Sequence, residues 1–297
     1  MNRSLTVLRT GPLCLVQDAG RVGHAADGVG RSGAADRRSA AQANALVGNR
    51  ADAAVLECTL GGLSVRAEDD LVVALTGAPA PADIDGEAVT HATRIRLASG
   101  KTLRLRTPRA GLRSYLAVEG GIAVDPVLGS RSTDTLSGLG PEPVAKNDRL
   151  PVGPETSHPA ADSGTDQSGT EIGASLTDLR VIFGPRDDWF DNRDELTTGE
   201  WLVSAQSNRV GLRLDRPDTD DATPPALQRK QSRELPSEGV ALGAIQVPPS
   251  GQPVMFLADH PITGGYPVIA VVIDADIDAA AQLRPGQRLR FVPVADP

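Results

Sequence analysis

The chain has 297 residues, of which 40% are hydrophobic and 3% aromatic, and its formal net charge is −8. That length suits one or two domains of about 150 residues each, built around an aliphatic core. No basic stripe interrupts the acidic balance, which argues against nucleic acid as the main partner. No apolar run approaches the roughly 18 to 20 residues of a membrane span, and no signal core precedes the first strand, so we expect a cytoplasmic protein without a membrane partner.

The N-terminal half predicts short strands around one long helix. Two strand-like runs come first, then a glycine-rich polar loop, and then a segment at 35–47 whose apolar residues recur at helical spacing. The predicted strands lie at 5–8, 13–17, 54–60, 63–67, 71–76, 93–97, 102–106 and 113–118. Such spacing, with hairpin-like turns and almost no helices between the strands, favours an all-β sandwich or barrel.

The C-terminal half predicts a second set of strands after a change in composition. Residues 151–176 are rich in Pro, Gly, Ser, Thr and Asp, which indicates a flexible linker or long loop. Strands are predicted at 179–183, 200–205, 209–214, 240–247, 253–257, 268–273 and 287–292, with a short helix at 276–283 and a charged loop at 215–234. We therefore expect β lobes at 1–150 and 177–297, with the functional site in a cleft between them.

Several familiar motifs are absent or misleading. The segment 28–33 has the pattern G-x-G-x-x-G, but no buried strand precedes it, so it does not fit a dinucleotide fingerprint. The chain has no P-loop, no G-x-S-x-G nucleophile motif, no amidase signature and no biotin-carrying Met-Lys-Met sequence. Cys14 and Cys58 lie in predicted strands without metal-ligand spacing, which favours buried free thiols and gives no metal site.

A polar turn at 256–267, between two predicted buried strands, gathers candidate catalytic groups. Asp259 and His260 form a candidate acid–base pair, in which His260 acts as a base or donates to a substrate oxygen. The alternative is a turn histidine satisfied by the backbone. Glu238, in a nearby loop bounded by proline, is the second acid–base candidate.

The same turn supplies candidate substrate-binding groups. Gly264 and Gly265 either permit positive φ or bring unshielded N–H groups to an anionic oxygen. Tyr266 either lends its hydroxyl or packs, while Thr263 and Gln246 add further polar groups. These residues are predicted to bind substrate.

A second polar loop contributes Ser130, Arg131, Thr133 and Asp134. Arg131 can clamp a carboxylate or a phosphate through two parallel hydrogen bonds, with the hydroxyls completing the site. The alternative is an ion pair between Arg131 and Asp134 that shapes the loop.

The remaining candidates are also polar or basic groups. Gln17 and Arg21, on either side of Asp18, allow the same two interpretations as the loop that carries Arg131. Arg186 and Arg209 are further candidates for binding an anion.

Short motifs along the chain resemble those of the biotin-dependent carboxyltransferase or allophanate hydrolase subunit 2 family. They occur in the expected order and cover nearly the whole chain. The motifs are VQDAGR at 16–21, SG at 32–33, LE at 56–57, GG at 61–62, LTGA at 75–78, SYLAV at 114–118, LGSRSTD at 128–134, LPSEGV at 235–240, GAIQVPPSGQPVMFLADH at 243–260 and TGGYP at 263–267. Ile262 replaces an expected threonine, and Gly30-Arg31 replaces a common proline-containing pair, which leaves the substrate's identity open.

The resemblance implies cyclophilin-like β-barrel architecture and the C-type subunit of an ATP-dependent 5-oxoprolinase, which acts on a small lactam or amide. The implied partners are a homologous B-type subunit of the allophanate hydrolase subunit 1 class (KipI-like) and a LamB/YcsF-like subunit of the A type. ATP is the cofactor that the resemblance implies for the complex. A phosphate site in this chain would need loop N–H groups and arginines, because the P-loop is absent.

Two alternatives stay open. The first is a biotin-dependent carboxyltransferase component that acts on urea or a related amide, with biotin on a separate carrier. Both chemistries polarise an amide carbonyl, so both can use the groups of the 256–267 turn. The second is a non-catalytic regulatory module that binds a kinase inhibitor-like partner.

Overall fold

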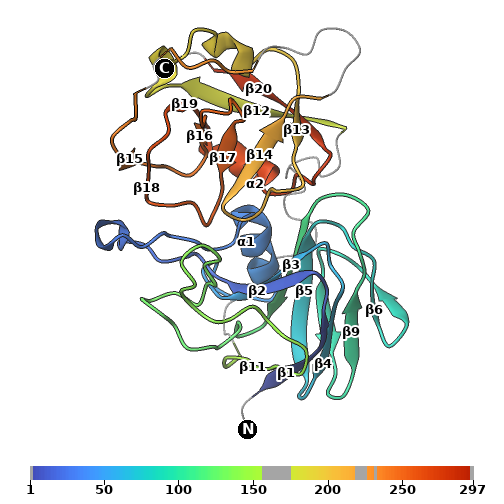
Figure 1. Ribbon diagram of the computed structural model, residues 1–297. Helices are drawn as coiled ribbons and strands as arrows, with labels where there is room; N and C mark the ends of the chain where they lie inside the picture. Colours follow the sequence, from blue (N-terminus) through green and yellow to red (C-terminus); the bar gives the residue numbers. More distant parts are fainter. Residues whose placement is uncertain (1–2, 156–174, 218–225, 231–232, 295–297) are drawn as a thin grey trace. The chain divides into compact units, whose positions relative to one another are not determined.

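The computed structural model describes residues 3–155, 175–217, 226–230 and 233–294. The chain forms two compact units: the N-terminal unit comprises 1–22 and 32–172, and the C-terminal unit comprises 23–31 and 173–297. Most of the linker predicted at 151–176 lies outside the described residues, as does part of the loop predicted at 215–234. Figure 1 labels helices and strands of both units.

The N-terminal unit contains two antiparallel sheets. One has six strands in the order β11 (Arg149–Pro151), β1 (Ser4–Thr10), β4 (Leu63–Ala67), β9 (Thr102–Leu105), β6 (Ala82–Ile84) and β7 (Glu87–Val89). The other has five, in the order β2 (Leu13–Gln17), β3 (Val55–Thr59), β10 (Arg113–Val118), β5 (Leu71–Gly77) and β8 (Arg94–Leu97).

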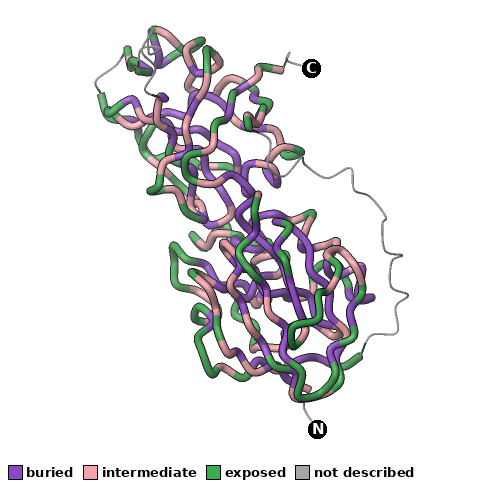
Figure 2. Tube along the Cα trace, turned by 90° about the vertical axis from the view of Figure 1, so that its right-hand side faces the viewer, coloured by how far each residue is buried: buried purple, intermediate pink, exposed green. Residues whose placement is uncertain are grey.

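Alternation of side chains explains how the two sheets share one core. In β4, Leu63 and Val65 are buried while Arg66 is exposed, because successive side chains point to opposite faces. Apolar residues from both sheets join in one cluster, which includes Val7 of β1 and Leu56 of β3. In Figure 2 the buried residues follow the strands, and the exposed ones gather at the turns.

The helix α1 (Arg37–Leu46) covers the second face of the five-stranded sheet. Asp36 caps it by accepting a hydrogen bond from the Ser39 N–H at 2.9 Å. Strand β10 is therefore buried on both faces: Leu116 belongs to the core between the sheets, while Tyr115 packs with the helix. The helix predicted at 35–47 is confirmed with slightly narrower bounds.

One hairpin in this unit was not predicted from the sequence. Strands β6 and β7 lie between the strands predicted at 71–76 and 93–97, in a stretch for which no strand was predicted. Their connection is Asp85-Gly86, and both residues have positive φ, at 50° and 98°. Positive φ at both central residues is the requirement of a type I′ hairpin turn, which favours the Asp-Gly pair.

The C-terminal unit is built on a closed barrel of seven strands. Their order is β12 (Leu176–Phe183), β19 (Val268–Val272), β16 (Ala244–Gln246), β17 (Val254–Phe256), β14 (Gly211–Asp215), β13 (Trp201–Val203) and β20 (Arg288–Pro293). Closure removes free sheet edges, and the apolar side chains fill the interior. The predicted all-β class is confirmed.

Short elements complete the C-terminal unit. The helix α2 (Ile277–Ala280) lies within the predicted 276–283 segment, and single-turn helices occur at Ala25–Asp27, Asp187–Trp189, Arg193–Leu196 and Asp274–Asp276. A separate two-stranded sheet pairs β15 (Glu238–Gly239) with β18 (Thr263–Gly264). No helix within the described ranges has the length and apolar character needed to cross a bilayer.

Tyr115 supports a test of how α1 is held on its sheet. Its buried hydroxyl donates to Glu57 Oε2 at 2.9 Å and accepts from the Asp36 N–H at 2.8 Å. Burial, with the nearby carboxylates of Glu57 and Asp36, raises the pKa of Tyr115 well above its ordinary value, so the hydroxyl stays protonated.

We expect Tyr115→Phe to lower the free energy of unfolding by about 1–3 kcal/mol, because the Glu57 carboxylate and the Asp36 N–H each lose a buried hydrogen-bond partner. Urea unfolding followed by circular dichroism measures this change. The matched control is Tyr266→Phe, since Tyr266 is 47% exposed. Equal stability of the two variants would contradict a supporting role for the Tyr115 hydroxyl.

Candidate functional site

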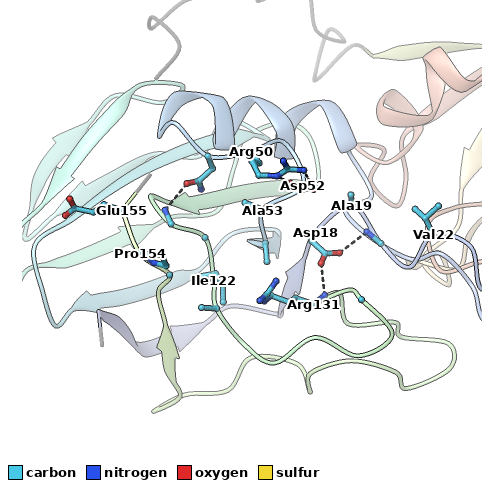
Figure 3. Close-up of a pocket in the computed structure, with 18 residues that line it drawn as sticks. Asp18, Ala19, Val22, Arg50, Asp52, Ala53, Ile122, Arg131, Pro154 and Glu155 are labelled. Carbon is cyan, nitrogen blue, oxygen red and sulfur yellow. Dashed lines mark hydrogen bonds and ion pairs between the residues drawn. The ribbon is translucent and has the colours of Figure 1, made fainter. Parts of the chain in front are cut away.

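Asp18 joins two loops of the N-terminal unit that lie more than a hundred residues apart in sequence. Its Oδ1 accepts hydrogen bonds from the Ser130 and Ser132 hydroxyls, both at 2.6 Å, and from the Gly20 N–H at 2.8 Å. Its Oδ2 accepts from the Arg131 N–H at 2.6 Å. Figure 3 shows the carboxylate directed at backbone nitrogens of both loops. One carboxylate therefore fixes the backbone on both sides of Arg131.

Arg131 is the candidate anion-binding group of this site. Its Nε donates to the Val124 carbonyl at 2.7 Å, which anchors the stem of the guanidinium. It has no carboxylate partner in the part of the chain that the structure describes. The Asp134 carboxylate instead accepts from the Leu136 N–H and the Ser137 hydroxyl, at 2.9 and 2.7 Å. The alternative of an ion pair between Arg131 and Asp134 is therefore wrong.

Gln17 and Thr133 hold the base of the same loop. The Gln17 amide nitrogen donates to the Thr133 carbonyl at 2.8 Å, and the Thr133 hydroxyl donates to the Pro141 carbonyl at 2.9 Å. Ser130 and Asp134 are also buried. The structure thus brings these four predicted residues together, and their side-chain polar atoms are bonded to the protein itself, except for the buried Gln17 Oε1, which has no hydrogen-bond partner among the described residues.

Arg21 stands out in this network because its charge is buried. The residue is 2% exposed, and its Nη2 donates to the Ser132 carbonyl at 2.5 Å. Its Nε and Nη1 have no hydrogen-bond partner among the described residues. A buried guanidinium without a carboxylate is costly, so the surroundings of Arg21 favour an anion or water at this position.

A cleft of about 740 Å³ opens beside Asp18 and Arg131 within the N-terminal unit. Five of its 18 lining residues are glycines, and two others, Arg50 and Asp52, pair with each other at 2.9–3.0 Å. Figure 3 shows Asp18, Ile122 and Arg131 among the residues that line it. The cleft has the size of a small-molecule site, and Arg131 is its unpaired cation.

Asp259 and Arg209, both predicted site residues in the C-terminal unit, form a buried ion pair. Two hydrogen bonds of 2.9 and 3.0 Å join them, and their side chains are 0% and 2% exposed. The His260 ring contacts the Pro261 carbonyl and the Phe256 ring. Asp259 and His260 therefore do not form the predicted acid–base pair, and a paired Arg209 is a poor candidate for binding an external anion.

The surroundings of His260 fix the position of its proton. Nδ1 lies 2.8 Å from the Pro261 carbonyl oxygen, which can only accept, so Nδ1 carries hydrogen. In the neutral ring Nε2 then has a free lone pair. The side chain is half-buried, so a small molecule can reach it. This arrangement suits a general base without help from Asp259.

Glu238 lies opposite the predicted glycine turn. The β15–β18 pairing places it across from Gly264, so the motifs at 235–240 and 263–267 meet in space as predicted. Its carboxylate forms an ion pair with Arg186. Hydrogen bonding from Arg186 outweighs desolvation and lowers the pKa of Glu238, so this group is a carboxylate at neutral pH rather than a proton donor.

The positive φ predicted as one explanation of the adjacent glycines is not observed. Neither Gly264 nor Gly265 has positive φ, so that interpretation is wrong. A Cβ on Gly264 would lie 2.5 Å from the Gln246 amide nitrogen, which donates to the Tyr266 carbonyl at 2.9 Å. Gly264 is thus needed as space for the buried Gln246 side chain. Thr263 and Tyr266 are exposed.

The described residues contain neither a cluster suited to a metal ion nor a disulfide. No group of three or more His, Cys, Asp or Glu there has the geometry of a metal site. Cys14 and Cys58 are buried free thiols, as predicted, with their sulfurs 3.7 Å apart.

Neither Ser132 nor the central part played by Asp18 was predicted from the sequence. Alternating serines on either side of Arg131 were a usable signal for both, since hydroxyls spaced two residues apart can bind one carboxylate oxygen.

Comparison with known proteins places these features in a family. The sequence matches the family described as "Carboxyltransferase domain, subdomain A and B" over residues 27–293. It is 40% identical to the Escherichia coli protein named as the C subunit of 5-oxoprolinase, over 97% of this chain and 90% of that protein. The Haemophilus influenzae protein of the same name is 32% identical over 94% of this chain and 88% of that protein. The resemblance inferred from the motifs is confirmed.

Solved structures show the same architecture. A crystal structure of the protein TTHA0988 superposes with a TM-score of 0.85 at 34% identity, covering 98% of this chain and 55% of that one. The chain thus spans about half the length of that protein. The urea amidolyase of K. lactis gives a TM-score of 0.88 at 27% identity, covering 99% of this chain and 19% of that one.

Proposed function

This chain belongs to the carboxyltransferase domain, subdomain A and B family, and we propose that it is the C-type subunit of an ATP-dependent 5-oxoprolinase. The observation that carries the proposal is the 40% identity with a protein named as the C subunit of 5-oxoprolinase, along nearly the full length of both chains. The name of these relatives implies partner subunits. We assign those places to a homologous KipI-like subunit of the B type and a LamB/YcsF-like subunit of the A type.

Each of the two units offers one candidate group for the chemistry of the proposed substrate, and the two candidates are proposed independently of each other. 5-Oxoproline is a cyclic amide with one free carboxylate. The unpaired guanidinium of Arg131, at the cleft of the N-terminal unit, is suited to a carboxylate because it presents parallel N–H donors. The Nε2 lone pair of His260 is suited to accept a proton during attack on an amide carbonyl. Each role stands on separate contacts and is tested separately.

The overall reaction opens the ring with water to give glutamate. Because the ring is the favoured product, the opening must be coupled to ATP hydrolysis. Neither a P-loop nor another recognised nucleotide motif occurs in this chain. We therefore assign the ATP requirement to the assembled complex.

A second candidate function has its own support. Urea amidolyases are 30–31% identical to this chain, and the K. lactis enzyme shares the fold. A component that transfers a carboxyl group from carboxybiotin, held on a separate carrier, to a urea-like nitrogen would use the same amide-polarising groups. This chain covers only 16–17% of those amidolyases, which is why 5-oxoprolinase is preferred.

The decisive experiment reconstitutes this chain with its candidate partner subunits and supplies ATP with 5-oxoproline. We expect glutamate release and ATP consumption that both require this chain. Urea with carboxybiotin is the parallel substrate pair. Glutamate release that is unchanged when this chain is omitted would contradict the proposal, and carboxylation of urea alone would favour the second function.

His260→Asn separates a catalytic role from a structural one. The asparagine amide can still donate to the Pro261 carbonyl, but it has no group equivalent to Nε2. We expect turnover in the reconstituted enzyme to fall by about 10²-fold or more, with little change in the thermal midpoint. The control is His24→Asn, at a half-buried histidine paired with Asp27. Turnover equal to that of the control would remove His260 from the mechanism.

Arg131→Ala tests recognition of the substrate carboxylate. A charge-assisted hydrogen bond contributes about 1.5–3 kcal/mol, so we expect KM for 5-oxoproline to rise about tenfold or more. Inhibition by 2-pyrrolidinone, which is the same ring without the carboxylate, should be unaffected. Arg50→Ala is the control, because Arg50 lines the same cleft but is paired with Asp52. If Arg131→Ala weakens the binding of 2-pyrrolidinone and of 5-oxoproline equally, Arg131 does not recognise the carboxylate.

A further inference from the structure

A second basic pocket lies on the outer face of the six-stranded sheet, away from the residues assigned to the proposed function. Its volume is about 310 Å³, and its polar lining consists of Arg9, Ser64, Arg104, Arg106 and Thr107. All of these belong to the N-terminal unit. No step of the proposed reaction uses any of them.

Strand register places the pocket's side chains in one row. Arg9 of β1 lies directly opposite Ser64 of β4, and Ser64 lies opposite Arg104 of β9. Directly opposite residues project from the same face of a sheet, with Cβ atoms about 5 Å apart. An irregularity in register between Val7 and Arg9 leaves Val7 buried and turns Arg9 outward.

In this row a short side chain, Ser64, lies between two long basic ones, Arg9 and Arg104. Neighbouring strands are about 4.8 Å apart, so Arg9 and Arg104 leave the sheet about 10 Å from each other. Ser64 between them is short, which leaves open space above it. Arg106 lies two residues beyond Arg104 and adds a third guanidinium from the same direction.

The charges of the pocket do not balance. Asp83 of β6 lies opposite Arg104 and provides the carboxylate that pairs with arginines of the pocket. Asp83 accepts from Arg106 at 2.9 Å and more distantly from Arg104 at 3.3 Å. Arg9 is exposed and has no carboxylate partner among the residues with described positions. Two of the three guanidinium groups thus share one carboxylate, and the third has none among the described residues.

The hydroxyls of the pocket are also available. Ser64 and Thr107 donate no side-chain hydrogen bond to the described protein, although each lines the space between the arginines. Arginine side chains bind phosphate through paired N–H donors, and hydroxyl groups complete such sites. A single carboxylate would leave part of the positive charge unsatisfied, whereas a diphosphate carries enough oxygens for all three arginines.

We propose that this pocket binds the phosphate oxygens of a small molecule that carries a diphosphate group. The inference is independent of the proposed 5-oxoprolinase activity, because it concerns other residues and is tested on this chain without partner subunits. A free diphosphate and the phosphates of a nucleotide present the same chemistry to the three arginines.

The experiment titrates the purified full-length chain with inorganic phosphate, pyrophosphate and ATP by calorimetry at low salt. Pyrophosphate is expected to bind at least tenfold more tightly than phosphate, and its affinity should fall as salt is added. ATP binding no tighter than pyrophosphate assigns recognition to the phosphates, whereas tighter ATP binding adds a contact to the nucleoside. Absence of pyrophosphate binding overturns the proposal.

Variants locate the binding. Arg9→Ala should weaken pyrophosphate at least fivefold, and Arg9→Glu should weaken it further; because Arg9 is exposed, neither change should unfold the chain. The control Arg66→Glu makes the same change of charge on the same sheet, outside the pocket, at an arginine paired with Glu68. Equal weakening by Arg66→Glu would reduce the effect to general electrostatics and overturn the proposal, as would loss of binding in Arg131→Ala but not in Arg9→Glu.

Discussion

The candidate site of the N-terminal unit depends on one carboxylate, that of Asp18, and on the hydrogen bonds that it accepts. It follows directly after β2, which is anchored in the five-stranded sheet, so its position is set by the core. Four donors converge on it, and two of them are hydroxyls on either side of Arg131. The loop at 128–134 has little apolar packing of its own, and hydrogen bonds to a fixed charge supply the order that a core would otherwise give.

In the barrel unit, the buried ion pair of Arg209 and Asp259 likewise fixes the backbone next to a candidate site residue. Breaking a buried ion pair leaves an uncompensated charge, so the two side chains hold the backbone before His260 in one position. The backbone hydrogen bond from the Asp259 N–H to the Arg209 carbonyl ties the same two residues. Asp259 therefore positions the turn, and His260 takes its orientation from the Pro261 carbonyl instead.

The fold class could be predicted from the sequence because short strand-like runs follow one another closely with almost no helices between them. Some strands, such as β8, also alternate exposed and buried side chains, whereas β10 is buried on both faces. The pattern failed where strands were too short to show a period: β6 and β7 have three residues each, and β15 and β18 have two. At the site, the sequence identified the loops that carry polar groups but not their pairings. Asp259 was paired with its neighbour His260, whereas its partner is Arg209, 50 residues earlier in the chain. Only the barrel register brings these two together, and no local pattern encodes that register.

The arginines of this chain divide into two groups by their partners, and this division is more informative than their number. Arg50, Arg180, Arg209 and Arg290 each face a carboxylate of their own at hydrogen-bonding distance, so each of these charges is balanced within the protein, unlike Arg104 and Arg106, which share Asp83. Arg131 and Arg9 have no such partner among the described residues, and both border a cavity. In a chain with a net charge of −8, carboxylates are plentiful, so a guanidinium beside a cavity without one is not explained by a shortage of acidic residues. The absence of a carboxylate partner at these two positions, within the described part of the chain, is what favours an anionic ligand at each.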